Sequence, residues 1–383
     1  MLNQYHLQET PPPRSLSRER RLWQVTDQLI SPLGCGSCPE QSICGALRIK
    51  TPVFDCLDFC CRNPKNCDNV CRSHPDYVDR VREVGGFSLE TVPRGPAIAG
   101  PLLPRIVPMI FHGSRRDLTF APPAVALSLY QMFDRRDGRL RFASREALCA
   151  SYRIAGPTEV ILSGTDCDAS VERWWGLEER QRRRMIQGLH RIGVALVTTP
   201  NYSMFTDVPR WNDLHAIKRI ALVHHELICE GVAAALHING RTETDFRRWA
   251  DFVNIRPEVT HLAYEFTTGT RWAGRREQHV AWLCELANAI KRPLHLIVRG
   301  GAEIVPELAR AFSVITVLET VSFIKTMMRH RAESNGNSHL RWISEPTSLG
   351  APLDVLFAHN IAVVRARLEQ LTAGQSLAMS EGA

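Results

Sequence analysis

Two aspartates and a cysteine follow a short apolar stretch of the sequence. Residues 160–162 are apolar and rich in β-branched side chains, which predicts a buried strand, and Asp166, Cys167 and Asp168 come just after it. Two carboxylates two positions apart in a loop can divide labour, one stabilising developing positive charge or orienting water while the other fixes its geometry. The alternative is that one of them caps the helix that follows. No partner histidine identifies Cys167 as a nucleophile, so we interpret it as a packing residue.

Polar side chains also follow the other predicted strands. Where strands run parallel, their carboxyl ends meet on one face, and ligand and catalytic groups lie there. Glu265 is predicted to be catalytic together with the aspartates, and the residues predicted to contact the substrate are Asn201, Tyr202, His237, Arg299 and Glu319. This mixed set suits an anionic, hydrogen-bonding organic substrate. The sequence has no histidine–carboxylate set at a recognised metal spacing, no phosphate loop of the Gly-x-x-x-x-Gly-Lys-Ser type and no Gly-x-Ser-x-Gly elbow.

Alternating apolar and amphipathic segments must position these groups. The pattern predicts eight strands, at 106–111, 160–162, 194–198, 233–238, 260–265, 294–298, 314–318 and 342–344. Each is followed by a predicted helix, the first at 124–133 and the last at 353–371. Eight strands, each followed by a helix, predict an α/β fold: a (β/α)8 TIM-like barrel preceded by a small cysteine-rich metal-binding module. An open doubly wound sheet is the alternative to the barrel.

Eight of the twelve cysteines fall in one short stretch of the chain. They are Cys35, Cys38, Cys44, Cys56, Cys60, Cys61, Cys67 and Cys71. In a chain without an export signal we expect thiols to be reduced, so this clustering predicts metal binding, which would supply the folding free energy of a segment without its own core. Since two adjacent cysteines rarely ligate one metal, either Cys60 or Cys61 is predicted to be spare.

The segment CGSCPEQSICGAL resembles the Cys-x2-Cys-x5-Cys part of the WhiB-type iron–sulfur regulators. In that family a fourth cysteine elsewhere completes the site. The resemblance implies a [4Fe–4S] cluster, and a zinc site (Zn) is the alternative.

Composition and charge divide the chain further. We predict a flexible basic lead-in over 1–30, the cysteine-rich metal module over 31–84, a linker over 85–104, the barrel over 105–372 and a disordered tail over 373–383. The net charge of +7 comes mainly from clustered arginines, and Arg182, Arg183 and Arg184 are predicted to bind nucleic-acid phosphates. The alternative is an ordinary solvated surface. Without a long apolar run or a signal peptide, we expect a cytoplasmic protein and no membrane partner, and the oligomeric state stays open.

Two motifs downstream of the aspartates carry a second resemblance. DASVERW, from Asp168, and TPNYSMFTDVP, over 199–209, resemble an uncharacterised domain family of phages and bacteria. Its members carry an Asp, then Phe-Glu-Arg-x-Trp, then Thr-Pro-Asp-Phe-Ser-Leu-Tyr-Thr-Asp-Met-Pro. This chain departs from that pattern at Asn201. The architecture is also similar, more distantly, to tRNA-guanine transglycosylase barrels, which break the N-glycosidic bond of a nucleobase with aspartates at strand ends and carry a cysteine-bound metal.

These features together predict an enzyme that cleaves or exchanges the N-glycosidic bond of a base in DNA: a DNA glycosylase or transglycosylase, with RNA as the alternative substrate. The enzyme would extrude the base, modified or not, and Tyr202, Phe205 or Trp174 would stack on it. The phage resemblance makes antiviral defence against phage DNA a natural context. Two rivals are a barrel acting on a small phosphorylated metabolite held by Arg299, Gly300 and Gly301, and a non-enzymatic iron–sulfur protein that binds nucleic acid.

Overall fold

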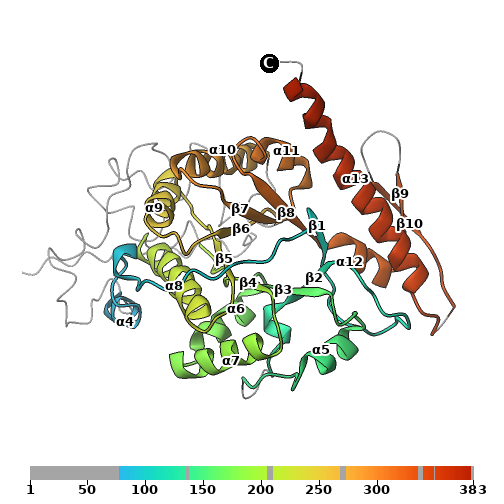
Figure 1. Ribbon diagram of the computed structural model, residues 1–383, viewed down its shortest axis with the longest axis horizontal. Coiled ribbons are helices and arrows are strands. Elements are labelled where there is room, and N and C mark those ends of the chain that lie inside the picture. Colours follow the sequence, from blue (N-terminus) through green and yellow to red (C-terminus); the bar gives the residue numbers. More distant parts are fainter. Residues whose placement is uncertain are drawn as a thin grey trace, which may run out of the picture.

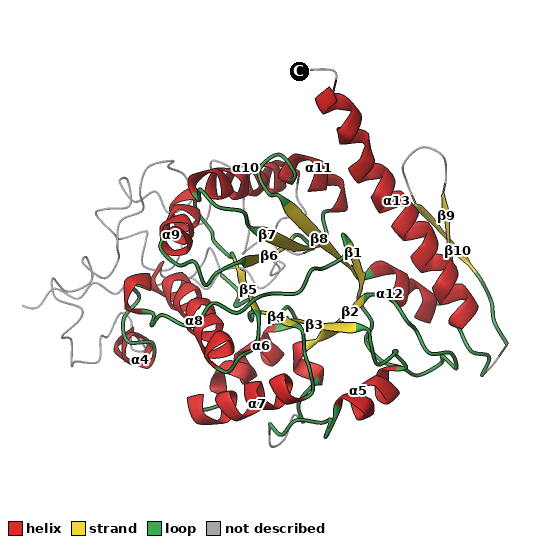
Figure 2. Ribbon diagram, in the orientation of Figure 1, coloured by secondary structure: helices red, strands yellow, loops and turns green. Residues whose placement is uncertain are grey.

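The computed structural model describes residues 77–134, 138–204, 210–267, 273–334, 340–348 and 350–380. Within these ranges an eight-stranded parallel sheet curls into a nearly closed barrel with helices around it (Figures 1 and 2). The predicted TIM-like barrel is therefore confirmed at the level of its architecture. The predicted metal ligands from Cys35 to Cys71 lie outside the described residues.

The barrel strands pair in the order β1-β8-β7-β6-β5-β4-β3-β2. They are β1 (Ile106–Pro108), β2 (Ala124–Ser128), β3 (Glu159–Ser163), β4 (Leu196–Thr198), β5 (Ala234–His237), β6 (His261–Glu265), β7 (His295–Arg299) and β8 (Val314–Glu319). The gap between β1 and β2 is bridged just beyond β1. There Met109 pairs with Ala126, and the N–H of Ile110 donates to the carbonyl of Ala126 at 3.0 Å.

Helices cover the outside of this barrel (Figure 2). They are α4 (Tyr77–Glu83), α5 (Arg145–Tyr152), α6 (Asp168–Gly176), α7 (Glu179–Arg191), α8 (Arg210–Cys229), α9 (Glu243–Asn254), α10 (Ala273–Ala289), α11 (Val305–Leu308), α12 (Val321–Met327) and α13 (Asp354–Ser380), with short 3-10 turns η2 (Leu89–Thr91), η3 (Leu129–Gln131) and η4 (Ala302–Ile304). Helix α13 runs past residue 371, where the last helix is predicted to end. Along the described helices, no stretch combines the length and the apolar character that a bilayer crossing requires.

Two of the predicted elements are wrong. The segment predicted as a helix over 124–133 begins with strand β2, whose five residues are all buried. A short apolar run such as AVALS fits a buried strand and a buried helix equally well, so periodicity alone does not separate them. The predicted eighth barrel strand at 342–344 instead belongs to β10 (Leu340–Ser344), which forms an antiparallel hairpin with β9 (His330–Ser334) outside the barrel.

The barrel interior changes from apolar to polar along the strands. The inner core consists of small or aliphatic residues, with at least one from each strand: Val107, Met109, Ala124, Ala126, Ile161, Leu196, Ala235, Ala263, Ile297 and Leu318. Because side chains alternate along a strand, the next inward positions toward the carboxyl ends are two residues later. On six strands these positions hold polar residues: Ser128, Ser163, Thr198, His237, Glu265 and Arg299. The sequence thus places polar chemistry at one end of an otherwise apolar barrel.

The segment predicted as a linker, 85–104, is packed against the barrel. Phe87 and Val92 are buried, and the ammonium of buried Lys218 on α8 donates to the carbonyl of Ser88 and the hydroxyl of Thr91, both at 2.5 Å. Leu103, at the far end of this segment, packs against the inner core. The segment therefore runs along the barrel before the chain enters β1 (Figure 1).

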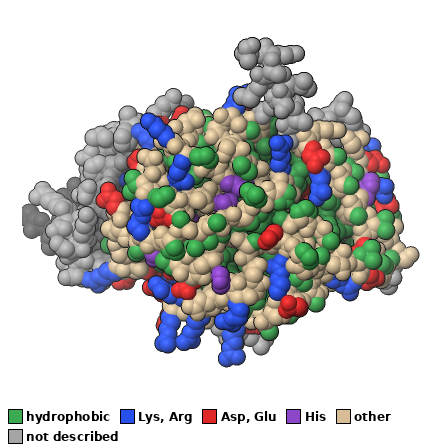
Figure 3. Space-filling view, viewed as in Figure 1, with side chains coloured by type: hydrophobic (Ala, Val, Ile, Leu, Met, Phe, Trp, Pro, Cys, Tyr) green, Lys and Arg blue, Asp and Glu red, His purple; other side chains and the backbone are tan. Residues whose placement is uncertain are grey.

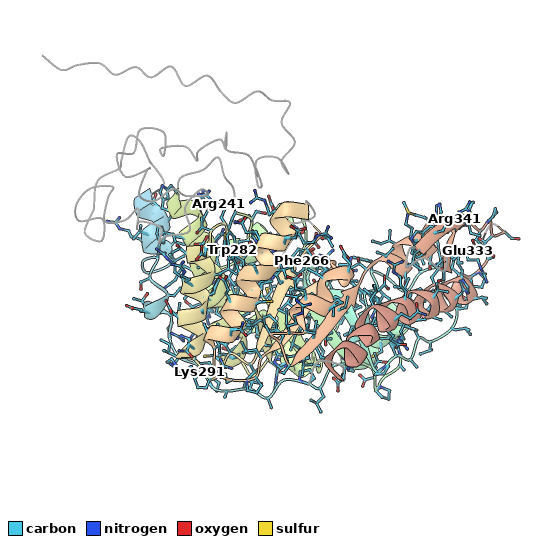
Figure 4. The ribbon with its side chains drawn as sticks, turned by 90° about the horizontal axis from the view of Figure 1, so that it is seen from above. Arg241, Phe266, Trp282, Lys291, Glu333 and Arg341 are labelled. Atoms are coloured by element: carbon cyan, nitrogen blue, oxygen red, sulfur yellow. The ribbon has the colours of Figure 1, made fainter. Side chains whose placement is uncertain are left out.

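Figure 4 separates the two ends of the barrel. Arg241, in the loop after β5, lies at the carboxyl end of the strands, and Lys291, in the loop before β7, lies at the opposite end. Glu333 and Arg341 mark the β9–β10 hairpin, which rises beside the carboxyl end.

Candidate active site at the barrel mouth

Asp166 is held in a fixed orientation at the carboxyl end of β3. The hydroxyl of Ser128, the last residue of β2, donates to Asp166 Oδ2 at 3.1 Å, and the N–H of Cys167 donates to Oδ1 at 2.7 Å. The Asp166 residue itself is exposed. A carboxylate that is fixed by two donors and still open to solvent can face a substrate without rearranging.

The loop that carries Asp166 depends on Gly164. The Gly164 N–H donates to Thr198 Oγ1 at 2.8 Å, and its carbonyl accepts from the Tyr130 hydroxyl at 2.9 Å. A Cβ at Gly164 would lie 2.4 Å from the Thr198 carbonyl oxygen and 2.5 Å from that of Thr199. Only glycine fits so close to β4, and this contact sets where the aspartates emerge.

Arg299 links opposite sides of the mouth. Its Nη1 donates to the Thr165 carbonyl at 3.1 Å and lies 3.5 Å from Glu265 Oε2. Strands β3 and β7 are separated by three strands in either direction around the barrel. The guanidinium therefore crosses the mouth and contacts both the backbone of the Asp166 loop and the carboxylate of Glu265.

Glu265 is the buried carboxyl group of this cluster, with 6% of its surface exposed. Its Oε1 accepts a hydrogen bond from the N–H of Thr267 at 2.7 Å and another from the Thr267 hydroxyl. Desolvation nevertheless raises the pKa of Glu265, and it outweighs the opposing effects of Arg299 and Thr267. A carboxyl group that keeps its proton to a higher pH can act as a general acid.

Asp168 lies slightly apart from this cluster. It is the first residue of α6, and its Oδ1 accepts from the Ser203 hydroxyl in the loop after β4 at 2.7 Å. The N-cap of α6 is Cys167, which makes no side-chain capping bond, so neither aspartate is the N-cap residue. A carboxylate in the first turn also complements the helix dipole. Asp168 therefore has a sufficient structural role, whereas Asp166 is exposed next to Thr165, whose carbonyl Arg299 contacts.

Asn201 and His237 differ in their access to the mouth. The Asn201 N–H donates to the Gly164 carbonyl at 3.0 Å, and its Oδ1 accepts from Asn239 Nδ2 at 2.7 Å, so the two amides lie beside the aspartate loop. His237 is 3% exposed, and burial lowers its pKa to about 3. Its imidazole is therefore neutral near pH 7, and its Nδ1 has no hydrogen-bond partner in the described structure.

Two residues predicted to contact substrate have structural roles instead. Tyr202 is fully buried, and the Arg219 guanidinium lies 3.9 Å from the centre of its ring, so the ring cannot stack on an extruded base. Glu319 accepts hydrogen bonds from the N–H groups of Val321 and Ser322, at 2.6 and 2.8 Å, which caps the start of α12. Alternation along β8 directs it away from the interior, because Leu318 occupies the inward position.

The three arginines predicted to bind phosphates are not equivalent. Arg182 is 6% exposed and pairs with Glu226 at 2.7 Å, so it is not available to a surface ligand. Arg183 is exposed and pairs with Glu179 at 2.9 Å, and Arg184 is exposed with no ion pair in the described structure. Figure 3 shows Lys and Arg side chains projecting from the edge of the molecule where α7 lies in Figure 1.

Ser128 and Tyr130 are site residues that the sequence analysis missed. Both lie in the segment that is predicted as a helix, so neither is recognised as following a strand. The sequence signal that could have identified them is the apolar run of β2, which is followed by Ser128 just as the apolar run of β3 is followed by Ser163. Over the described ranges there is also no group of three or more His, Cys, Asp or Glu side chains that could hold a metal ion.

No protein-family model matches the sequence, and a search of curated proteins finds no match. The similarity to the phage and bacterial domain family therefore stays an expectation from its two motifs.

Proposed function

We propose that this chain is an enzyme that cleaves or exchanges the N-glycosidic bond of a base in DNA. One observation carries the proposal. Two carboxyl groups in unlike environments, exposed Asp166 and buried Glu265, lie at the barrel mouth, where Arg299 contacts Glu265 and the backbone carbonyl of Thr165, next to Asp166. Paired carboxyl groups whose environments differ in this way suit the division of acid and stabiliser that glycosidic bonds require.

Each group has a defined task in the proposed reaction. As the bond between C1′ and the base nitrogen breaks, its electron pair leaves with the base, and Glu265 donates a proton to that base. Asp166 stabilises the cationic sugar that remains and orients a water, whose oxygen bonds to C1′ as its proton passes to the Asp166 carboxylate. In an exchange reaction a second base takes the place of this water. Arg299 holds the Glu265 carboxyl group and the backbone of the loop that carries Asp166, and Asn201 with Asn239 offers amide groups to a base edge.

The proposed DNA partner rests on charge and accessibility. A stacked base cannot enter a barrel mouth, so the reaction requires base extrusion, and exposed arginines such as Arg184 supply phosphate contacts. The metal held by the cysteine-rich segment, [4Fe–4S] or zinc, is proposed as a structural clamp. Defence against phage DNA is the context that the phage resemblance favours.

Base release from DNA tests the proposal. Unmodified and hypermodified phage DNA, with RNA in parallel, are incubated with the full chain, and free bases are measured by mass spectrometry. The matched variants are Glu265→Gln and Glu319→Gln, since both glutamates are buried at strand ends with raised pKa values but only Glu265 lies in the cluster. We expect Glu265→Gln to lose activity and Glu319→Gln to keep it. No released base from any substrate, or a fully active Glu265→Gln, would contradict the proposal.

A further inference from the structure

One side of the barrel mouth is formed by the loop after β1 and by α12. Helix α12 follows β8, which is the neighbour of β1 in the barrel, so both segments leave the carboxyl ends of adjacent strands. The ring of His112, in the loop, packs edge-on against Phe323 of α12, with 4.9 Å between the ring centres. The two segments are therefore in contact, and we call the surface formed by residues 112–118 and 321–328 the β1–α12 rim.

One face of α12 is apolar and open to solvent. Val321, Ile324 and Met328 are 42%, 43% and 59% exposed, and their spacing places them on one side of the helix, whereas Phe323 on the other side is buried. Val321 lies at the strand end itself, because its N–H donates to Glu319 Oε1 at 2.6 Å. Large apolar side chains that gather on an exposed surface mark a site of interaction, unlike single scattered ones.

The charges available on this rim are positive. Arg115 is exposed, and its side chain has no hydrogen bond or ion pair with a described residue. Lys325, beside the apolar face, lies 5.8 Å from the centre of the Trp342 ring and has no ion pair within the described ranges. Asp117 is the only carboxylate in the rim sequence, and it pairs with Arg153 at 3.0 Å. Two cations beside an apolar face complement an anionic ligand that also has apolar parts.

The rim lies a few nucleotides away from Asp166. Strand β1 is two strands from β3, because Met109 pairs with Ala126 of β2, and β2 pairs with β3. Neighbouring strands are about 4.8 Å apart, which puts the loop after β1 about 10 Å from the strand that carries Asp166. The phosphates of one DNA strand follow one another at about 3.4 Å along the helix axis. The β1–α12 rim is thus about three phosphates from a nucleotide that reacts at Asp166.

We propose that the β1–α12 rim binds the DNA strand beside the extruded nucleotide. Arg115 and Lys325 contact its phosphates. The apolar face of α12 packs against the bases that lose a stacking partner when the reacting base leaves the duplex. The inference rests on the proposed function for its DNA partner, and it adds an interface that the groups at the mouth do not supply.

Two double variants of equal charge test the phosphate contacts. Arg115→Gln with Lys325→Gln removes two positive charges from the rim. The control, Arg105→Gln with Lys291→Gln, removes two from the opposite end of the barrel, where both residues are exposed and without an ion pair to a described residue, Arg105 before β1 and Lys291 before β7 (Figure 4). Binding of the full chain to a DNA duplex with one mismatched base pair is measured by fluorescence anisotropy between about 50 and 200 mM salt.

The rim variant should reduce the steepness of the salt dependence by about two, since each phosphate contact contributes about 0.9 to the slope of log K against log salt. Its affinity at the lowest salt should fall about tenfold or more, whereas the control should keep the parental slope. Both variants should melt as the parent does, because none of the four side chains has an ion pair among the described residues. Equal losses in the two variants, or a parental slope in the rim variant, would overturn the inference.

The apolar face is tested by Ile324→Ser with Met328→Ser. The control is Leu102→Ser with Ile255→Ser, which changes one fully exposed and one 60% exposed side chain in the segments before β1 and β6. The rim variant should lose about fivefold or more of the parental preference for the mismatched over the matched duplex, and the control should keep that preference. An unchanged preference in the rim variant contradicts the inference.

Sedimentation without DNA tests the other occupant of this face, a second copy of the chain. A parent dimer that Ile324→Ser with Met328→Ser converts to a monomer would show that the face pairs two copies, and this result also overturns the inference. A parent and variant of equal mass support it. All these measurements are of binding and assembly, so a failure to release bases leaves them unaffected, and the two proposals can fail separately.

Discussion

Replacing Arg182 by methionine should destabilise the protein without reducing the DNA affinity of the molecules that remain folded. Arg182 donates from Nε to Glu226 Oε2 at 2.9 Å, from Nη2 to Glu226 Oε1 at 2.7 Å and from Nη1 to the Trp175 carbonyl at 3.0 Å. Both partners of the ion pair have 7% of their side chains exposed. Removing one partner leaves the other charge buried and unpaired, which costs about 3–5 kcal/mol. The expected fall in melting temperature is about 6 °C or more.

The double variant Arg182→Met with Glu226→Met should recover most of this loss, because replacing a whole buried pair with apolar side chains is often neutral. The matched surface variant is Arg184→Ala, whose stability should change by less than about 0.5 kcal/mol. That variant should instead weaken DNA binding and lower the salt slope by about one unit. Thermal melts and salt-dependent binding are measured on all three. An Arg182→Met protein that melts normally but loses DNA affinity would refute this assignment of buried and surface roles.

Three further perturbations test the site and the metal. Burial raises the pKa of Glu265 in the folded protein, so ionisation of this residue lowers the stability as the pH rises from the unfolded pKa through the folded one. Glu265→Gln should therefore melt at a higher temperature than the parent at neutral pH and at the same temperature at acid pH. Equal melting temperatures at every pH would contradict this. Gly164→Ala should lower the free energy of unfolding in urea by about 1–3 kcal/mol, because its Cβ would lie 2.4 Å from the Thr198 carbonyl oxygen. Gly176→Ala, whose Cβ meets no atom within 4 Å, should leave the free energy of unfolding unchanged. Equal losses in the two variants would show that the close contact at Gly164 has no effect on stability. Full-length protein prepared without oxygen should contain iron, with absorbance near about 400 nm, or zinc, and metal analysis that finds neither would contradict metal binding by the cysteines of residues 35–71.

The barrel and much of its mouth could be predicted from the sequence because parallel strands are buried on both faces. Seven of the predicted strand segments overlap strands of the barrel. Glu265 and Arg299 stand at the ends of two of these segments, which predicts that they lie at the barrel mouth, and the structure places them side by side there. The wrong prediction at 124–133 has a physical cause, because the four successive apolar residues of β2 show neither a helical nor a strand period. Ser128 and Tyr130 were missed for that reason.

The roles of individual polar residues could not be predicted, because they depend on neighbours distant in sequence. Arg182 and Arg184 are alike in the sequence, but Glu226 on α8 lies opposite only the first of them. Tyr202 is buried under Arg219, and Glu319 caps the next helix of its own chain. Selecting every polar residue at a strand end therefore includes too many residues in the site. The tertiary contacts show which of them have structural roles and which groups remain at the mouth.

Base release by Asp166→Asn and Asp168→Asn tests the central claim most directly. In Asp166→Asn the amide oxygen still accepts from the Cys167 N–H and the NH2 group donates to the Ser128 hydroxyl, and in Asp168→Asn the oxygen still accepts from the Ser203 hydroxyl. Both variants should therefore fold with unchanged melting temperature and DNA affinity. Asp166→Asn should lose about 10²-fold or more of the rate, because it removes the charge that stabilises the cationic sugar, and Asp168→Asn should stay within about tenfold of the parent. An Asp166→Asn protein that releases bases at the parental rate would contradict the account.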